Sequence, residues 1–112
     1  MKLSACALVA LLAGPALAKD TPLDGAAILA ALTDVELVYE DGATQLFRDG
    51  GVTIYDNGRP STGRWAVRED RYCSSWPPSE TWACYVVTQS PDGQTIGFVA
   101  DDGSTTSGHR VP

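Results

Sequence analysis

Positive charge is scarce in this sequence. Eight lysine and arginine residues stand against fourteen aspartate and glutamate residues, and the net charge at pH 7 is −6. A protein that binds nucleic acid needs a basic surface to pair with phosphates, and anionic lipid surfaces attract basic segments. The composition therefore argues against both partners. The composition permits a basic protein partner. Alternatively, the acidic residues serve only to keep the protein soluble.

Histidine and the familiar catalytic motifs are also scarce or absent. His109 is the only histidine, and it lies three residues from the end of the sequence. We expect this segment to fray and to hold a catalytic base poorly. No G-x-S-x-G, P-loop or G-x-G-x-x-G motif occurs. We therefore expect no enzymatic activity and no cofactor.

Cysteine is sparse as well, with Cys6, Cys73 and Cys84 as the whole set. The last two are too far apart for a C-x-x-C redox motif and, with one histidine, too few for a tetrahedral zinc site. The acidic turns lack the spacing of an EF-hand, so we expect no metal. The pair instead predicts a Cys73–Cys84 disulfide, formed in an oxidising compartment. Closing that ring stabilises a small domain by about 2 to 3 kcal/mol on the chain-entropy model.

Long apolar runs are missing except near the N-terminus. Residues 1–18, MKLSACALVALLAGPALA, place Lys2 before an apolar run and end in the small-residue cleavage pattern of a secretory signal. The run is shorter than the roughly 20 residues that cross a bilayer. We predict cleavage after Ala18, export to the periplasm or the medium, and no membrane span afterwards. Cleavage would remove Lys2 with the signal and change the net charge from −6 to −7.

The remaining residues, 19–112, predict a single β-rich domain. Apolar residues recur at helical spacing over residues 23–33, with a cap from Thr21 before Pro22 or from Asp24 before Gly25. After this segment the period changes to two, and glycine turns recur every eight residues, at 42, 50 and 58. The fold class is therefore α+β or mainly β. We expect the helix to pack on an antiparallel meander of about seven strands.

Three alternating runs predict which side chains face the core. In the first run, Trp65 and Val67 face one side, and Arg64, Ala66 and Arg68 face the other. The other two runs predict inward sets of Trp82, Cys84 and Val86, and of Ile96, Phe98 and Ala100.

The loop between the two cysteines is the strongest candidate for a site. Pro77 and Pro78 favour an extended PPII backbone, and rigid aromatic residues such as Trp76 and Trp82 are common anchors in recognition. Alternatively, both tryptophans pack beside the disulfide and the prolines only shape a turn. Arg64 and Arg68 share a strand face and could grip a carboxylate or phosphate, or remain a solvated face beside acids. The predicted binding residues are Trp76, Pro77, Pro78, Trp82, Arg64 and Arg68.

Four motifs follow one another in the second half of the chain. They are Gly-Arg-Trp-x-Val at 63–67, Tyr-Cys-x-x-Trp at 72–76, Trp-x-Cys-Tyr-x-Val at 82–87 and Gly-x-x-x-x-Phe-x-x-x-Asp-Gly at 93–103. Together with a signal, a short helix and hairpins, this order resembles small exported proteins of Gram-negative bacteria that carry a tryptophan and a cysteine pair in a β-meander. The resemblance spans residues 23–110. It implies export and this fold, and it implies no activity.

The function predicted from the sequence is binding. We expect an exported, non-catalytic binding or accessory protein that engages a protein or envelope component through the disulfide-braced Trp/Pro loop. One alternative is an acidic inhibitor of a basic secreted enzyme, such as a lysozyme-type hydrolase, steered by charge. The other is a small hydrolase that uses a pair of carboxylates.

Overall fold

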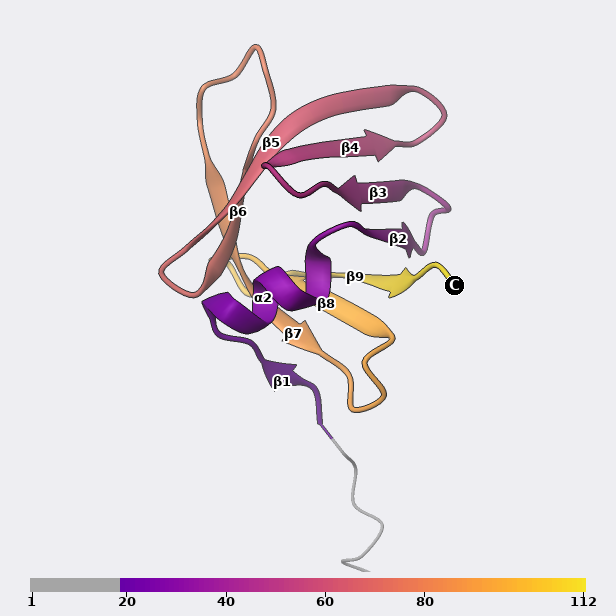
Figure 1. The fold of residues 1–112 in the computed structure, drawn as a ribbon, viewed down its shortest axis with the longest axis vertical. Helices are drawn as coiled ribbons and strands as arrows, with labels where there is room; N and C mark the ends of the chain where they lie inside the picture. Colours follow the sequence, from indigo (N-terminus) through magenta and orange to yellow (C-terminus); the bar gives the residue numbers. More distant parts are fainter. Residues whose placement is uncertain (1–18) are drawn as a thin grey trace, which may run out of the picture.

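Eight antiparallel strands close into a barrel in the computed structural model, which describes residues 19–112. The strands are β2 (Val35–Tyr39), β3 (Thr44–Phe47), β4 (Val52–Asp56), β5 (Pro60–Arg68), β6 (Arg71–Ser75), β7 (Ala83–Gln89), β8 (Thr95–Val99) and β9 (Thr105–Arg110). Each strand pairs with the next along the chain, and β9 pairs with β2 to close the ring. Figure 1 shows the long β5 curving from its hairpin with β4 to its hairpin with β6. The predicted signal, residues 1–18, lies outside the described residues.

The structure corrects the prediction of an open meander. Neighbouring strands pair as expected, but β9 completes a ring. The strands number nine because a two-residue strand, β1 (Thr21–Pro22), also pairs with the end of β7. Closure depends on the tilt and stagger of all the strands together, which no local pattern reports. The prediction of a frayed segment around His109 is also wrong. This residue pairs with Val38 in β2 and with Thr95 in β8, and its Nδ1 lies 3.1 Å from the Thr95 hydroxyl.

The predicted helix is present as α2 (Gly25–Leu32). Asp24 is its N-cap and accepts a hydrogen bond from Ala27 N at 2.9 Å, so the second of the two predicted caps is correct. Asp70, in the turn between β5 and β6, accepts a further bond from Gly25 N at 2.7 Å. The start of the helix is thereby tied to the barrel wall. Within residues 19–112, no helix is long and apolar enough to cross a membrane.

The helix fills one end of the barrel. Its buried residues Ile28, Ala31 and Leu32 join a core cluster with Leu37, Phe47, Trp65, Tyr72, Val87, Ile96 and Phe98. Phe47 packs edge-on against Trp65 and Tyr72, with ring centroids 5.7 and 5.6 Å apart. The predicted inward faces of β5 and β8 are thus confirmed for Trp65, Val67, Ile96 and Phe98, although Ala100 lies in the turn after β8 and is half-buried.

The predicted inward face of β7 is wrong. Val87 is buried in the core and Tyr85 packs against it, whereas Val86 is exposed and Cys84 faces the opposite side of the sheet. Both alternating faces of this strand are apolar, so the sequence pattern alone cannot select between them. The choice is made by the pairing with β6, which sets Cys84 opposite Cys73 and Tyr85 opposite Tyr72.

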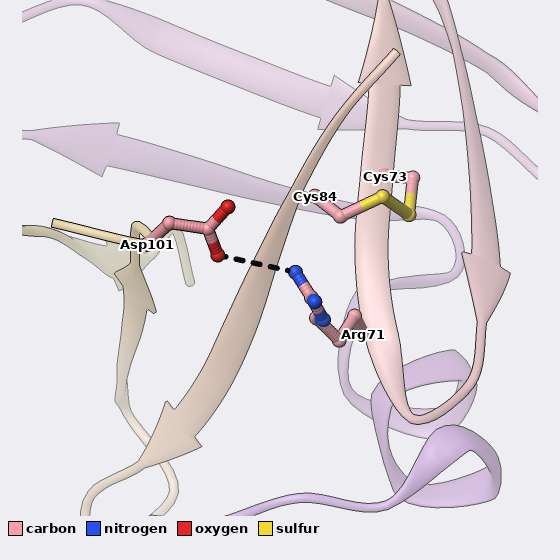
Figure 2. Close-up of a disulfide and its surroundings, with 4 residues drawn as sticks. All are labelled: Arg71, Cys73, Cys84 and Asp101. Carbon is pink, nitrogen blue, oxygen red and sulfur yellow. Dashed lines mark hydrogen bonds and ion pairs between the residues drawn. A yellow bond between two sulfur atoms is a disulfide. The ribbon is translucent and has the colours of Figure 1, made fainter. Parts of the chain in front are cut away.

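The predicted disulfide is confirmed. Cys73 and Cys84 lie directly opposite each other on β6 and β7, with their Cα atoms 4.0 Å apart (Figure 2). Nearby, Arg71 reaches Asp101, which follows β8, with a nitrogen to oxygen distance of 3.4 Å. On the outside of the barrel, the disulfide links β6 covalently to β7, and the exposed ion pair connects β6 with the turn after β8.

Candidate functional site

The end of the barrel away from α2 is open. A hollow of about 940 Å³ lies where β2, β4, β6 and β8 end and where β3, β5, β7 and β9 begin. We call this hollow and its rim the mouth. Eight-stranded barrels have interiors of the size that side chains fill or that holds one small ligand. In this barrel the helix fills one end, and the mouth remains accessible at the other.

Aromatic side chains form a large part of the wall of the mouth. Tyr55 has its ring centroid 6.3 Å from that of Tyr39 on one side and 6.3 Å from that of Trp76 on the other. Deeper in the barrel, Tyr72 contacts Phe98 at 5.2 Å between centroids and Tyr85 at 6.2 Å. The lining therefore contains six aromatic residues, Tyr39, Tyr55, Tyr72, Trp76, Tyr85 and Phe98.

A buried polar network forms the floor. Gln45 accepts a hydrogen bond from the Tyr39 hydroxyl at 2.6 Å and donates from Nε2 to the Thr53 hydroxyl at 2.9 Å and to the Tyr72 hydroxyl at 3.2 Å. Thr53 in turn donates to the carbonyl oxygen of Leu46 at 2.9 Å. Gln45 and Thr53 are both buried. Their bonds satisfy polar groups that would otherwise destabilise the barrel, and they hold the two tyrosines in place.

The two tyrosines of this network stay neutral. Burial raises the pKa of Tyr39 well above its usual value, and the neighbouring Tyr72 and Tyr55 add to the effect. Burial also raises the pKa of Tyr72, against hydrogen bonds that lower it. The floor of the mouth is therefore polar but uncharged at every ordinary pH.

Trp76 owes its position to a glycine. Its ring lies over Gly63 of β5, where an added Cβ would come within 2.6 Å of Trp76 Cε3 and 2.8 Å of the Ser75 carbonyl oxygen. Its indole nitrogen donates to the Ser74 hydroxyl at 3.2 Å. The tryptophan is thus held flat against the inner wall, beside Tyr55. Gly63, which begins the motif at 63–67, and Trp76, which ends the motif at 72–76, are therefore in contact with each other.

The loop predicted as a site is divided between two sides of the wall. Trp76 and Pro77 line the mouth, whereas Pro78 is exposed and does not. Ser79 N donates to the Trp76 carbonyl oxygen at 3.1 Å, so the prolines occupy a turn and the expected PPII extension is wrong. Trp82 lies on the outer wall beside Cys84, in a smaller depression with Arg71 and Asp101.

The two predicted arginines lie outside the mouth. Arg64 and Arg68 share the outer face of β5, as expected from the alternation, and both are exposed. The guanidinium of Arg68 lies 4.3 Å from the centre of the Trp82 ring, which is a cation–π contact on the outer wall. The structure therefore brings Arg68 and Trp82 together, and it separates them from Trp76 and Pro77.

Most residues of the mouth were not among the predicted site residues. Tyr39, Gln45, Tyr55 and Tyr85 were not predicted as site residues, because each belongs to an ordinary alternating strand. A signal was present: polar and aromatic residues occupy inward-facing positions near the strand ends. That signal has meaning only once the strands are known to close into a barrel. The other residues of the lining are polar or charged: Glu40, Asp41, Ser61, Thr62, Ser74, Thr105, Thr106 and Ser107.

Comparisons with models of protein families, with curated proteins and with solved structures found no match.

Proposed function

We propose that this chain is an exported, non-catalytic binding protein whose barrel mouth takes up one small ligand. The observation that carries the proposal is the hollow of about 940 Å³ with six aromatic side chains in its lining. Small-molecule sites are concave and largely apolar, with a few fixed polar groups that orient the ligand. The mouth is concave, its aromatic rings supply apolar surface, and Gln45 and its tyrosine partners supply fixed polar groups.

Two further observations support the other parts of the proposal. The signal pattern of residues 1–18 and the Cys73–Cys84 disulfide support export to an oxidising compartment. The described lining contains no histidine, cysteine or lysine, so the usual pairs of nucleophile and base do not assemble there. Binding without turnover is the chemistry that this set of side chains supports best.

Of the six residues predicted to bind, Trp76 and Pro77 lie in the proposed site. The other four, Arg64, Arg68, Pro78 and Trp82, face the outside of the barrel or the solvent. This division provides a matched pair of tryptophan variants. Trp76→Ala removes part of the wall of the mouth, and Trp82→Ala removes a tryptophan of the outer wall from the same loop.

The test is a titration of the oxidised protein with Nile red, a neutral dye that fluoresces strongly in apolar sites. We expect one dye molecule to bind per chain, with about tenfold weaker binding to Trp76→Ala, because a buried aromatic contact contributes on the order of 1 to 2 kcal/mol. Binding to Trp82→Ala should match the unaltered protein. Equal weakening by both variants, or no saturable binding to the unaltered protein, would contradict the proposal.

A further inference from the structure

The charged residues in the lining of the mouth are both acidic. Glu40 and Asp41 belong to the lining, which contains no lysine, arginine or histidine. Within residues 19–112 the one ion pair joins Arg71 to Asp101 on the outer wall, so no basic side chain neutralises these two acids. Asp41 accepts a hydrogen bond from Ala43 N at 3.0 Å, which fixes its carboxylate in the turn after β2. An anionic ligand would meet two negative charges here and no positive partner.

The aromatic wall next to these acids favours a positive ligand group for a second reason. The face of an aromatic ring is negative, so tyrosine and tryptophan rings attract ammonium groups, and several rings together form the cages that bind quaternary ammonium ligands. Tyr39 directly precedes the two acids, and the Tyr39, Tyr55 and Trp76 rings follow one another round the wall at 6.3 Å intervals. Aromatic rings and carboxylates therefore lie on the same side of the mouth.

The field of the whole chain acts in the same direction. The net charge of the full sequence is −6. Net negative charge raises the local concentration of cations and lowers that of anions. Arg59, an exposed residue of the turn between β4 and β5 at this end of the barrel, is not part of the lining.

We infer that the ligand of the mouth is an organic cation, namely an alkylated ammonium group carrying an apolar chain or ring. The ammonium group lies against Tyr39, Tyr55 and Trp76, close to Glu40 and Asp41. The apolar part reaches toward Phe98 and Tyr85 deeper in the barrel. This inference rests on the proposed function and adds to it the chemical class of the ligand.

The test uses three soluble probes that share an eight-carbon chain and differ in the head group: octyltrimethylammonium, octyl glucoside and octanoate. Each is titrated into the oxidised ¹⁵N-labelled protein below its micelle concentration, and the indole N–H signals of Trp76 and Trp82 are followed. We expect octyltrimethylammonium to bind about tenfold more tightly than either other probe. The Trp76 signal should shift, while the Trp82 signal stays in place.

Two charge variants separate the local acids from the field of the whole chain. Glu40→Gln with Asp41→Asn should reduce the ratio of octyltrimethylammonium affinity to octyl glucoside affinity severalfold. Glu36→Gln with Asp49→Asn makes the same change of charge at exposed positions outside the lining, and it should preserve the preference. Equal loss in both variants would overturn the assignment of the cation to Glu40 and Asp41.

The outcomes distinguish this inference from the proposed function. If octanoate or octyl glucoside shifts Trp76 at the same or lower concentration, the ligand is not a cation, and the small-ligand proposal stands. If none of the three probes shifts Trp76 while Nile red binds and depends on Trp76, the cation inference is overturned and the small-ligand proposal stands. If Nile red also fails to bind, both are overturned. Probe binding that shifts only Trp82 would overturn both, because it would place the site on the outer wall.

Discussion

Gly63 is the residue on which the aromatic wall of the mouth depends. A methyl group there would lie 2.6 Å from the Trp76 ring and 2.8 Å from the Ser75 carbonyl oxygen. Overpacking of this kind costs about 1 to 3 kcal/mol, because side chain and backbone must both move. We expect Gly63→Ala to lower the free energy of unfolding by that amount in urea titrations and to weaken Nile red binding.

The double variant Gly63→Ala, Trp76→Ala tests the mechanism. With the indole removed, the added methyl group meets only the backbone, so Gly63→Ala should cost less than in the unaltered protein. The same cost in both backgrounds would show that the contact with Trp76 is not what requires glycine.

A second prediction at the residue scale concerns pH. Burial raises the pKa of Tyr39 in the folded protein, whereas in the unfolded chain tyrosine ionises near its usual pKa of about 10. As the pH rises, the unfolded chain therefore loses the Tyr39 proton at a lower pH than the folded protein does. The folded state has its full stability below about pH 10, and the free energy of unfolding declines as the pH rises above that value. We expect the free energy of unfolding to fall between about pH 9 and 11. Tyr39→Phe should make that fall shallower, at the cost of about 1 kcal/mol at neutral pH for the lost bond to Gln45. An identical decline in the variant would refute the assignment to Tyr39.

At the scale of elements, α2 acts as the closure of one barrel end. Leu32 is fully buried in the core, whereas Leu29 on the same helix is 49% exposed. We expect Leu32→Ala to lower the free energy of unfolding by about 2 to 5 kcal/mol, the usual range for a core leucine. Leu29→Ala should change it by no more than about 0.5 kcal/mol, since alanine is also an excellent helix former. Urea titrations of both variants would measure the difference, and equal effects would mean that the helix does not close the barrel through this face.

Elements set by local chemistry were predictable from the sequence. The helix, its cap at Asp24, the glycine turns at 42, 50 and 58 with positive φ, and the disulfide all depend on residues close together or on one cysteine pair. The face of β7 was not predictable, because Trp82, Cys84 and Val86 are as apolar as the residues between them. Pairing with β6 across the barrel wall decides that face.

The mouth could not be predicted either, because it depends on the pairing of strands that are still farther apart in the sequence. Tyr39, Tyr55, Trp76 and Phe98 come from four separate strands or strand ends, and they surround one hollow only because β9 returns to β2. The tryptophans and prolines of residues 76–82 did predict a binding site in this loop. Its two ends nevertheless lie on opposite sides of the wall, and only the first belongs to the mouth.

At the scale of the whole molecule, the pairing of β9 with β2 is the contact that makes the barrel. A chain that ends before Ser104 lacks β9 and leaves β2 and β8 with unpaired edges. We expect this truncation to lose its cooperative urea transition in circular dichroism, because unpaired edges and an opened core do not support a stable small sheet. A chain that ends after Arg110 retains all of β9 and should keep the transition. A cooperative transition in the shorter chain would show that closure is dispensable.

The pairing of β9 with β2 also determines when the barrel can close during synthesis of the chain. A growing or translocating chain emerges from its N-terminal side, yet β1 finds its partner only in β7, and β2 finds its second partner only in β9. Contacts between segments so distant in sequence make folding slow, on the order of milliseconds to seconds for β-rich domains. Until the last strand arrives, the mouth has no complete wall, and a ligand has nothing to bind. The proposed uptake of a ligand can therefore begin only after synthesis of the chain has reached β9.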